Sequence, residues 1–137
     1  MPIIGYVDMV ADLFHYGHVR MLKKAKANCD YLIAGIHDDE TVESYKRTPI
    51  MNMSERIEVV EACKYTDQVI SSTPLIITKD FLENYNIDLV FHAHTAEEHP
   101  KYEYMYREII DKFRRLDYTE EISTTDIIDR LKNRYIC

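Results

Sequence analysis

The chain has 137 residues, which is the size of one compact domain. Acidic residues outnumber basic residues 24 to 17, and the formal net charge of -7 argues against nonspecific binding to nucleic acid or to an anionic membrane, because both need a basic surface. Only three glycines are present, Gly5, Gly17 and Gly35, and their spacing excludes the glycine-rich dinucleotide fingerprint and the P-loop. Any nucleotide must therefore be bound without a glycine-rich loop.

Strands and helices are predicted to alternate through the first half of the chain. Ile3–Val10 is β-branched and apolar, and Tyr31–Ile36 is an unbroken apolar run of the kind that forms a strand covered on both faces. His18–Asn28 carries apolar residues at helical spacing. We also predict a short helix over Asp38–Tyr45 and, after a loop, a helix over Ser54–Lys64 that is capped by its serine.

The second half continues this alternation. Gln68–Ser71 and Asp88–Ala93 are predicted strands, and between them Thr78–Tyr85 is a predicted helix capped by its threonine. From Pro100 to Leu116, apolar residues follow at steps of three and four, which predicts an amphipathic helix that begins near the proline.

The last elements complete the predicted fold. We expect a fifth strand over Asp117–Ile122 and a final helix opened by a capping box at Ser123-x-x-Asp126. The apolar residues expected to face inward are Ile127, Ile128, Leu131 and Tyr135. This alternation predicts an α/β fold over residues 1–137, a single Rossmann-like three-layer domain with a parallel sheet of about five strands. Ligands bind such folds at the carboxyl ends of the strands.

Cysteine usage and the N-terminus bear on location. Cys29, Cys63 and Cys137 are widely spaced and form no C-x-x-C pair, so a zinc knuckle and a thioredoxin-type motif are excluded. An odd number of separate cysteines suits a reduced compartment, and we expect a cytoplasmic protein. No signal-peptide pattern is visible, and no stretch approaches the ~20 apolar residues that span a bilayer.

The segment His15-Tyr16-Gly17-His18 follows the first predicted strand and opens a helix. Histidines three residues apart share one face of a helical turn, where free N–H groups and a partial positive charge attract anions. Gly17 allows close approach of a ligand to the backbone, and histidine donates hydrogen bonds to phosphate oxygens. The alternative is a pair of histidines on a solvated helix start, and the position after a buried strand favours an anion site.

These residues, with features further along the chain, resemble the cytidylyltransferase family, which includes enzymes for phosphocholine, phosphoethanolamine and glycerol 3-phosphate. The family's H-x-G-H stands at His15–His18, and its R-T-x-G-I-S-T-[ST] motif is partly present over Tyr118–Thr125. Features shared with the family between the two motifs are Tyr31–Gly35, Lys46, Glu55-Arg56 and Lys64–Val69. Their order and spacing match over nearly the whole chain.

The resemblance implies transfer of CMP from CTP to a phosphorylated alcohol, phosphoethanolamine or phosphocholine, with Mg²⁺ accompanying CTP and no metal held by protein side chains. It implies a homodimer, and the net charge of -7 argues against a nucleic-acid partner. It makes His15, His18 and Lys46 the catalytic residues. The implied nucleotide-binding residues are Val10, Ala11, His15, Gly17, His18, Thr119, Ile122, Ser123 and Thr124. The implied substrate-binding residues are Lys46, His92 and His94.

The chain departs from the family pattern at several positions. Tyr118 replaces an arginine that would clamp phosphate, and Glu121 replaces a glycine and adds negative charge. Met9 replaces another glycine and would crowd the backbone where phosphate approaches. Ala93–Thr95 stands where the family has acids that recognise the alcohol headgroup. Arg114-Arg115 is close enough in sequence to supply the missing positive charge.

Alternatives remain at the level of both residues and function. His92 and His94 share one face of a strand and with His99 could hold zinc, although no carboxylate or thiol stands fixed beside them. Asp12 and Arg56 suit a structural role as well as a catalytic one. The departures leave open a nucleotide-binding pseudoenzyme, and an adenylyltransferase remains open because that group shares H-x-G-H.

Overall fold

One parallel sheet forms the middle layer of the protein, for which a computed structural model describes residues 1–119 and 122–136. The strands are β1 (Ile4–Met9), β2 (Tyr31–Ile36), β3 (Gln68–Ser71), β4 (Leu89–Ala93) and β5 (Phe113–Leu116). They lie in the order β3-β2-β1-β4-β5, and each pairing is parallel. The predicted α/β, Rossmann-like fold is therefore confirmed.

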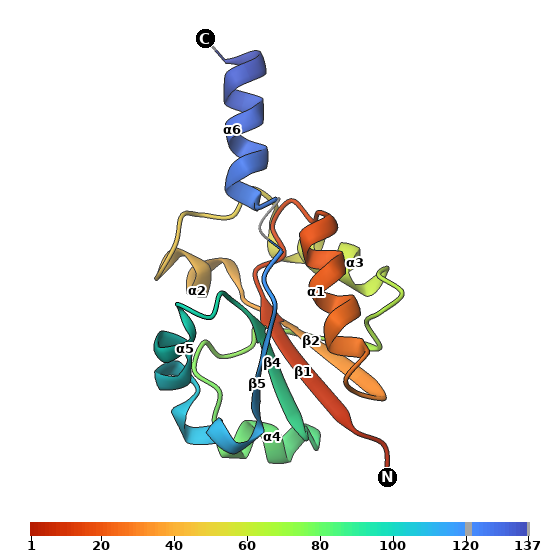
Figure 1. Ribbon diagram of the computed structural model, residues 1–137. Helices are drawn as coiled ribbons and strands as arrows, with labels where there is room; N and C mark the ends of the chain where they lie inside the picture. Colours follow the sequence, from red (N-terminus) through yellow and green to blue (C-terminus); the bar gives the residue numbers. More distant parts are fainter. Residues whose placement is uncertain (120–121, 137) are drawn as a thin grey trace.

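Helices cover both faces of the sheet (Figure 1). The helices are α1 (Tyr16–Lys26), α2 (Asp39–Glu43), α3 (Met53–Glu61), α4 (Lys79–Tyr85), α5 (His99–Met105), a 3-10 helix (Arg107–Lys112) and α6 (Thr124–Tyr135). Leu22 of α1 and Val60 of α3 pack with Val7 on one face. Phe81 of α4 packs with Tyr6 on the other face. Because neighbouring strand residues point to opposite faces, β1 contributes to both cores.

The strand order changes direction at β1. From β1 the chain builds outward through β2 and β3, and it then crosses to the other side of β1 to add β4 and β5. The segments that follow the carboxyl ends of β1 and β4 therefore lead to opposite faces of the sheet. A crevice is left between the two strand ends. The start of α6 returns to this same edge (Figure 1).

Side chains cap most of the helices, and one predicted cap is wrong. Thr78 caps α4 and Ser123 caps α6, each accepting a backbone N–H, at 3.2 and 3.1 Å, as predicted. The reciprocal bond of the predicted capping box, from the Ser123 N–H to Asp126, is not formed among the described residues. The predicted cap Ser54 lies inside α3, which is capped by Asn52 instead. Asn52 prevails because Glu55 stands three residues after it, so that each side chain accepts the backbone N–H of the other.

The long amphipathic helix predicted over 100–116 is wrong in its second half. Helix α5 ends at Met105, a 3-10 helix follows, and Phe113–Leu116 forms edge strand β5 rather than the predicted strand over 117–122. Phe113 and Leu116 are buried at the two ends of β5 and the arginines between them are exposed. A spacing of three suits a helix face, but here the free edge of β4 offers backbone hydrogen bonds that a helix cannot use.

Helix α6 projects from the body of the protein (Figure 1). None of its residues is buried, and Leu131 and Tyr135 are 47% and 76% exposed. The prediction that its apolar residues face inward is therefore wrong for Leu131 and Tyr135, whereas Ile127 and Ile128 near the start of the helix are half-buried. Its amphipathic pattern is real, but within the described part of this chain no other element packs against the apolar stripe along its length.

Candidate active site

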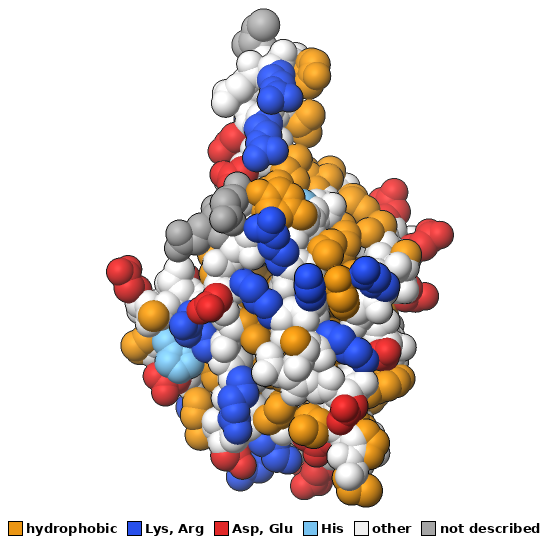
Figure 2. Space-filling model, turned by 45° about the vertical axis from the view of Figure 1, so that its right-hand side comes forward, with side chains coloured by type: hydrophobic (Ala, Val, Ile, Leu, Met, Phe, Trp, Pro, Cys, Tyr) orange, Lys and Arg blue, Asp and Glu red, His pale blue; other side chains and the backbone are white. Residues whose placement is uncertain are grey.

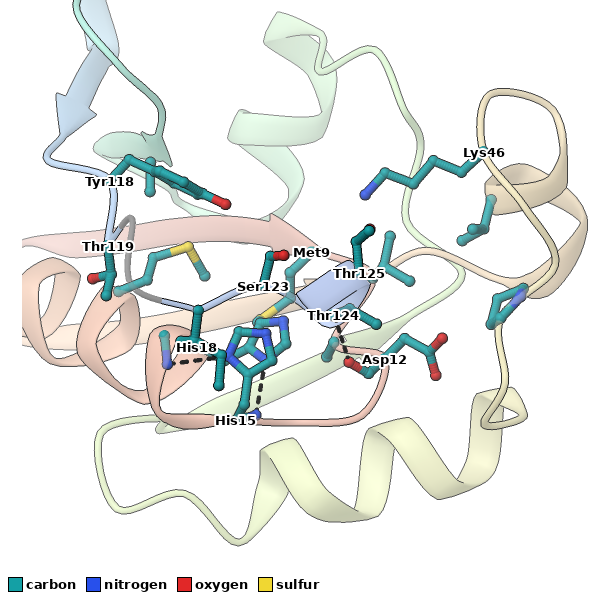
Figure 3. Close-up of a pocket in the computed structure, with 18 of the residues that line it drawn as sticks. Met9, Asp12, His15, His18, Lys46, Tyr118, Thr119, Ser123, Thr124 and Thr125 are labelled. Carbon is teal, nitrogen blue, oxygen red and sulfur yellow. Dashed lines mark hydrogen bonds between the residues drawn. The ribbon is translucent and has the colours of Figure 1, made fainter. Parts of the chain in front are cut away.

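A cavity of about 530 Å³ lies at the carboxyl ends of β1 and β4 (Figure 3). Its walls come from the β1–α1 loop, the first turn of α1, the loop after α2, the end of β4 and the start of α6. The predicted site residues that line it are Val10, Ala11, His15, Gly17, His18, Lys46, His92, Thr119, Ile122, Ser123 and Thr124. Sequence-distant motifs therefore meet in one place, at the switch in strand order.

The H-x-G-H segment forms a capping box at the start of α1. His15 is the N-cap, and its Nδ1 accepts the Gly17 N–H at 3.1 Å. Nδ1 of His18 accepts the His15 backbone N–H at 3.1 Å, and the two rings lie 3.8 Å apart (Figure 3). Because Nδ1 is an acceptor in both rings, each neutral imidazole carries its proton on Nε2. The site therefore holds two Nε2–H donors side by side at a helix N-terminus.

Burial keeps these histidines neutral at pH 7. It lowers the pKa of His18 to about 3, with further lowering from His15 and Lys46, and it lowers the pKa of His15 as well. Each neutral imidazole can donate a hydrogen bond from its Nε2–H group to a phosphate oxygen as negative charge develops on that oxygen.

We expect acid to destabilise the protein through its buried histidines. Burial holds the pKa of His18 and His94 at about 3 and about 4 in the folded state, below the ~6.5 of an unfolded histidine. As the pH falls below ~6.5, the unfolded chain binds protons that the folded chain does not, so the free energy of unfolding decreases. Urea midpoints measured from about pH 7.5 to pH 5 should fall, and they should fall less steeply for His94→Phe. Equal slopes for both proteins would contradict this account.

Gly17 is required for space rather than for an unusual backbone angle. A Cβ built on Gly17 would lie 2.9 Å from Nδ1 and Cε1 of His15 and 3.2 Å from Cγ2 of Ile122. The His15 ring lies against this residue because it caps the helix, and Ile122, which precedes α6, lies against it as well. Any side chain here would displace the catalytic candidate itself.

Asp12 joins three segments around the cavity. Its two carboxylate oxygens accept the backbone N–H groups of Ile50 and Met51, each at 2.9 Å, and its carbonyl accepts the Thr124 hydroxyl at 2.9 Å. The β1–α1 loop, the chain before α3 and the start of α6 are thus held together (Figure 3). The structural reading of Asp12 is therefore the one that its contacts support.

Lys46 extends from the loop after α2 and points its Nζ into the cavity (Figure 3). Partial desolvation lowers its pKa, and the neighbouring Arg47 lowers it further. Arg47 also lines the cavity, and its guanidinium donates to the Thr125 hydroxyl at 3.4 Å. Arg47 was not among the predicted site residues, although its place beside Lys46 was the available signal.

The predicted contribution of Arg114 and Arg115 to the cavity is wrong. Arg114 donates to the carbonyls of Asp111 and Phe113, and Arg115 donates to the carbonyl of His94 and to Asp117. Both belong to edge strand β5, which pairs with β4 and directs them along the sheet. The arginine that does line the cavity among the described residues is Arg47.

The other departures from the family pattern fall partly inside the site. Tyr118 and the buried Met9 line the cavity, whereas Glu121 lies outside the described residues. Asp8 is a further cavity residue that was not among the predicted site residues. The structure places its carboxylate, 7% exposed, at the cavity wall, where it accepts the Tyr106 hydroxyl at 2.9 Å.

The three histidines near β4 form a chain rather than a metal site. His92 lines the cavity, but His94 is not among the lining residues and is 1% exposed, so direct substrate binding by His94 is not supported. His94 contacts His92 through Nδ1 and His99 through Nε2. One ion cannot bind both nitrogens of the same ring, and no cluster suited to a metal is found among the described residues.

Residues 9–130 match the family model described as Cytidylyltransferase-like. The chain belongs to this family. It is 36% identical over 132 residues to ethanolamine-phosphate cytidylyltransferase of Dictyostelium discoideum, covering 95% of this chain and 37% of that protein. It is 37% identical over 138 residues to choline-phosphate cytidylyltransferase A of Mus musculus, covering 98% of this chain and 38% of that protein. The chain thus spans well under half of either relative.

Solved structures confirm the fold of this cytidylyltransferase-like chain. The lipopolysaccharide core biosynthesis protein from Thermoplasma volcanium superposes with a TM-score of 0.70 at 20% identity, covering 88% of this chain and all of that one (100%). Pantothenate synthetase from Thermus thermophilus superposes with a TM-score of 0.63 at 9% identity, covering 90% of this chain and 60% of that one. At such identities the likeness concerns the fold alone.

Proposed function

We propose that this chain transfers CMP from CTP to phosphoethanolamine or phosphocholine and releases pyrophosphate. The observation that carries the proposal is the cavity wall built by His15 and His18, whose two Nε2–H donors face a space that Lys46 and Arg47 enter from the opposite loop. Donors and cations on two sides of one cavity suit a reaction between a triphosphate and a phosphate monoester.

The reaction needs no covalent intermediate with the protein. A phosphate oxygen of the alcohol substrate attacks the α-phosphorus of CTP, and the bond from that phosphorus to the bridging oxygen breaks as pyrophosphate leaves. His15 and His18 would donate hydrogen bonds to the oxygens that gain charge. Lys46 would reduce the repulsion between the two substrates, and both effects act mainly through position and charge.

The headgroup end of the cavity supports a cationic alcohol. Asp8 supplies a buried carboxylate at the cavity wall, and its Oδ1 accepts the Tyr106 hydroxyl. A buried carboxylate favours a cation beside it, because an unpaired buried charge is costly. Phosphoethanolamine and phosphocholine carry such a cation, whereas glycerol 3-phosphate does not.

A pyrophosphate-release assay tests the function and its rivals. CTP and ATP would each be paired with phosphoethanolamine, phosphocholine and glycerol 3-phosphate. We expect turnover with CTP and a cationic phospho-alcohol. CTP binding by calorimetry without turnover would favour the pseudoenzyme that Tyr118 and Met9 at the cavity suggest, and a clear preference for ATP would favour an adenylyltransferase.

Removal of the Lys46 charge should lower kcat/KM strongly and leave the stability of the fold almost unchanged. For Lys46→Met we expect kcat/KM to fall by about 100-fold or more, since a cation that faces transferring phosphates is lost. The side chain extends into the cavity, so the urea midpoint should change little. Arg47→Gln on the same loop is the comparison. For this variant we expect a smaller fall in kcat/KM, which arises from a higher KM for CTP. An unchanged kcat/KM for Lys46→Met would contradict the assigned role.

Mg²⁺ is proposed to arrive bound to CTP. Both carboxylate oxygens of Asp12 already accept backbone N–H groups, so this cavity carboxylate suits structure better than metal binding. Mg²⁺ commonly keeps several waters and binds mainly through substrate phosphates. When bound, it would offset the negative charge of the triphosphate.

Assembly and location are further parts of the proposal. We propose a homodimer formed through the H-x-G-H region, where Tyr16 is 43% exposed, and through Lys64–Val69. Hydrophobic side chains gather where α6 meets the body (Figure 2). Light scattering would test the dimer. No helix among the described residues is long and apolar enough to cross a membrane, and we propose a cytoplasmic protein, testable by fractionation.

A further inference from the structure

Three histidines connect the cavity to the protein surface. Nδ1 of His92 lies 2.9 Å from Nδ1 of His94, and Nε2 of His94 lies 2.8 Å from Nδ1 of His99. His92 lines the cavity, His94 is 1% exposed, and the His99 side chain is 34% exposed. The row therefore runs from the substrate space through a buried ring to solvent.

Aromatic rings hold this row in place. The Tyr102 ring stacks on His92 and His94, with centroids 4.2 and 4.5 Å away. Phe113 lies nearly parallel to His94 and His99, at 6.0 and 6.1 Å. These ring contacts restrict rotation of the three imidazoles and so favour the nitrogen contacts.

Counting protons shows that the two contacts are coupled. A neutral imidazole has one N–H, and both nitrogens of His94 face another ring nitrogen, so His94 donates on one side and accepts on the other. In one arrangement His92 donates to His94 and His94 donates to His99, which leaves Nε2 of His92 as an acceptor. In the reverse arrangement every donor points toward the cavity and Nε2 of His92 carries a proton.

The surface end selects between the arrangements. Nε2 of His99 lies 3.8 Å from Oε1 of Glu103. A neutral His99 keeps its proton on Nε2 beside this carboxylate, so its Nδ1 accepts from His94. A protonated His99 must donate from Nδ1, which reverses the row. The Glu103 carboxylate faces the His99 ring from the next turn of the helix.

On the basis of this geometry, and given the proposed function, we propose that His92, His94 and His99 form a proton relay that converts the monoprotonated phosphate of the substrate into its dianion. The phosphate O–H gives its proton to Nε2 of His92, the Nδ1 proton of His92 passes to Nδ1 of His94, and the Nε2 proton of His94 passes to Nδ1 of His99. His99 becomes an imidazolium beside Glu103 and then releases its Nε2 proton to solvent. His92 is left donating Nε2–H to the dianion.

The relay has a clear chemical use. A phosphate monoester loses its second proton near pH ~6, so part of the substrate carries one proton in mildly acidic solution. The dianion is the better nucleophile, and a base within the site makes the protonated form usable. No hydrogen bond within the described residues occupies Nε2 of His92, which leaves it available to the substrate.

Several charged groups surround the relay and influence the protonation of its inner histidines. Those around His92 are Asp8, Glu98, Lys46 and His37. Those around His94 are Glu98 and Arg115, besides the neighbouring histidines. Burial lowers the pKa of both His92 and His94, so the two inner rings rest in the neutral form that a relay requires. Glu103 acts at the exposed ring.

The first test is nitrogen NMR of the histidine rings, recorded against pH on the ligand-free protein. We expect His92 to change from Nδ1–H to Nε2–H as His99 becomes protonated, and to stop following pH in His99→Gln. A His92 tautomer that ignores the protonation of His99 would overturn the proposal. This result does not depend on turnover, so it stands apart from the proposed function.

The second test is the pH dependence of kcat/KM for the phospho-alcohol. In His94→Phe, which keeps the stacked ring, we expect activity to fall about twofold near pH 6, where about half of the substrate carries the extra proton, and to stay at the wild-type level near pH 8.5, where the substrate is already a dianion. His94→Gln keeps hydrogen-bonding atoms but cannot pass a proton, and it should behave like His94→Phe. Tyr102→Phe is the control and should keep the wild-type profile. A uniform loss at every pH would assign His94 a merely structural role and overturn the relay.

Discussion

His15→Asn is expected to leave the fold intact and to lower turnover by about 100- to 1,000-fold. Asparagine is a good N-cap, and its Oδ1 can take the place of Nδ1 in accepting the Gly17 N–H. It places no donor where Nε2 of His15 lies. The change therefore removes the hydrogen bond to the reacting phosphates while it keeps the start of α1. Pyrophosphate release and urea unfolding would measure the two effects.

A matched variant separates catalysis from capping. His15→Ala loses both the cap and the donor, so we expect the same loss of turnover together with a loss of about 1 kcal/mol in the free energy of unfolding. If the asparagine variant kept wild-type turnover while the alanine variant lost it, the role of His15 would be to cap α1 alone. The proposed donation from Nε2 would then be wrong.

Arg56→Met should cost about 3–5 kcal/mol in the free energy of unfolding because three carbonyl oxygens lose their donor, the largest stability effect that we expect from a single change. The Arg56 side chain is 0% exposed and donates to the carbonyls of Val10, His37 and Met51 as well as to the carboxylate of Asp39. Methionine fills much of the volume but leaves three carbonyl oxygens without this donor. Urea unfolding would measure the loss.

Asp39→Asn is the control for Arg56. The Asp39 side chain is 44% exposed, so removal of its charge should cost less than about 1 kcal/mol. The backbone contacts of Arg56 remain in this variant. Equal losses in the two variants would mean that the ion pair, rather than the three carbonyls, accounts for the contribution of Arg56. Because Val10 lines the cavity, Arg56→Met should also raise KM for CTP.

Local signals explain why much of the fold was predictable. The strand over Tyr31–Ile36 was predicted with the bounds that the structure shows, because it is apolar on both faces. Caps such as Thr78 and Ser123 act on N–H groups three residues away, so sequence alone reveals them. The H-x-G-H segment combines a capping residue with a following helix, and the structure places it at the expected edge of the sheet.

Long-range choices were not predictable in the same way. Phe113 and Leu116 have a spacing that suits one face of a helix, and the edge of β4 decided that they form a strand. The apolar stripe of α6 looks like a core face, but no element in the described part of this chain covers it. In both cases the outcome depends on which partner surface is near, and the spacing of residues does not contain that information.

The sequence by itself determined the parallel α/β fold, the family and a set of site residues of which all but His94 line the cavity, because these follow from local periodicity, caps and ordered motifs. The tertiary structure alone decided what the side chains of the site contact. It turned His94 from a substrate ligand into the buried middle of a histidine row, placed Arg47 at the cavity in place of Arg114 and Arg115, and made Arg56 a structural hub. These outcomes depend on contacts between segments far apart in the chain, which only the packed fold brings within hydrogen-bonding distance.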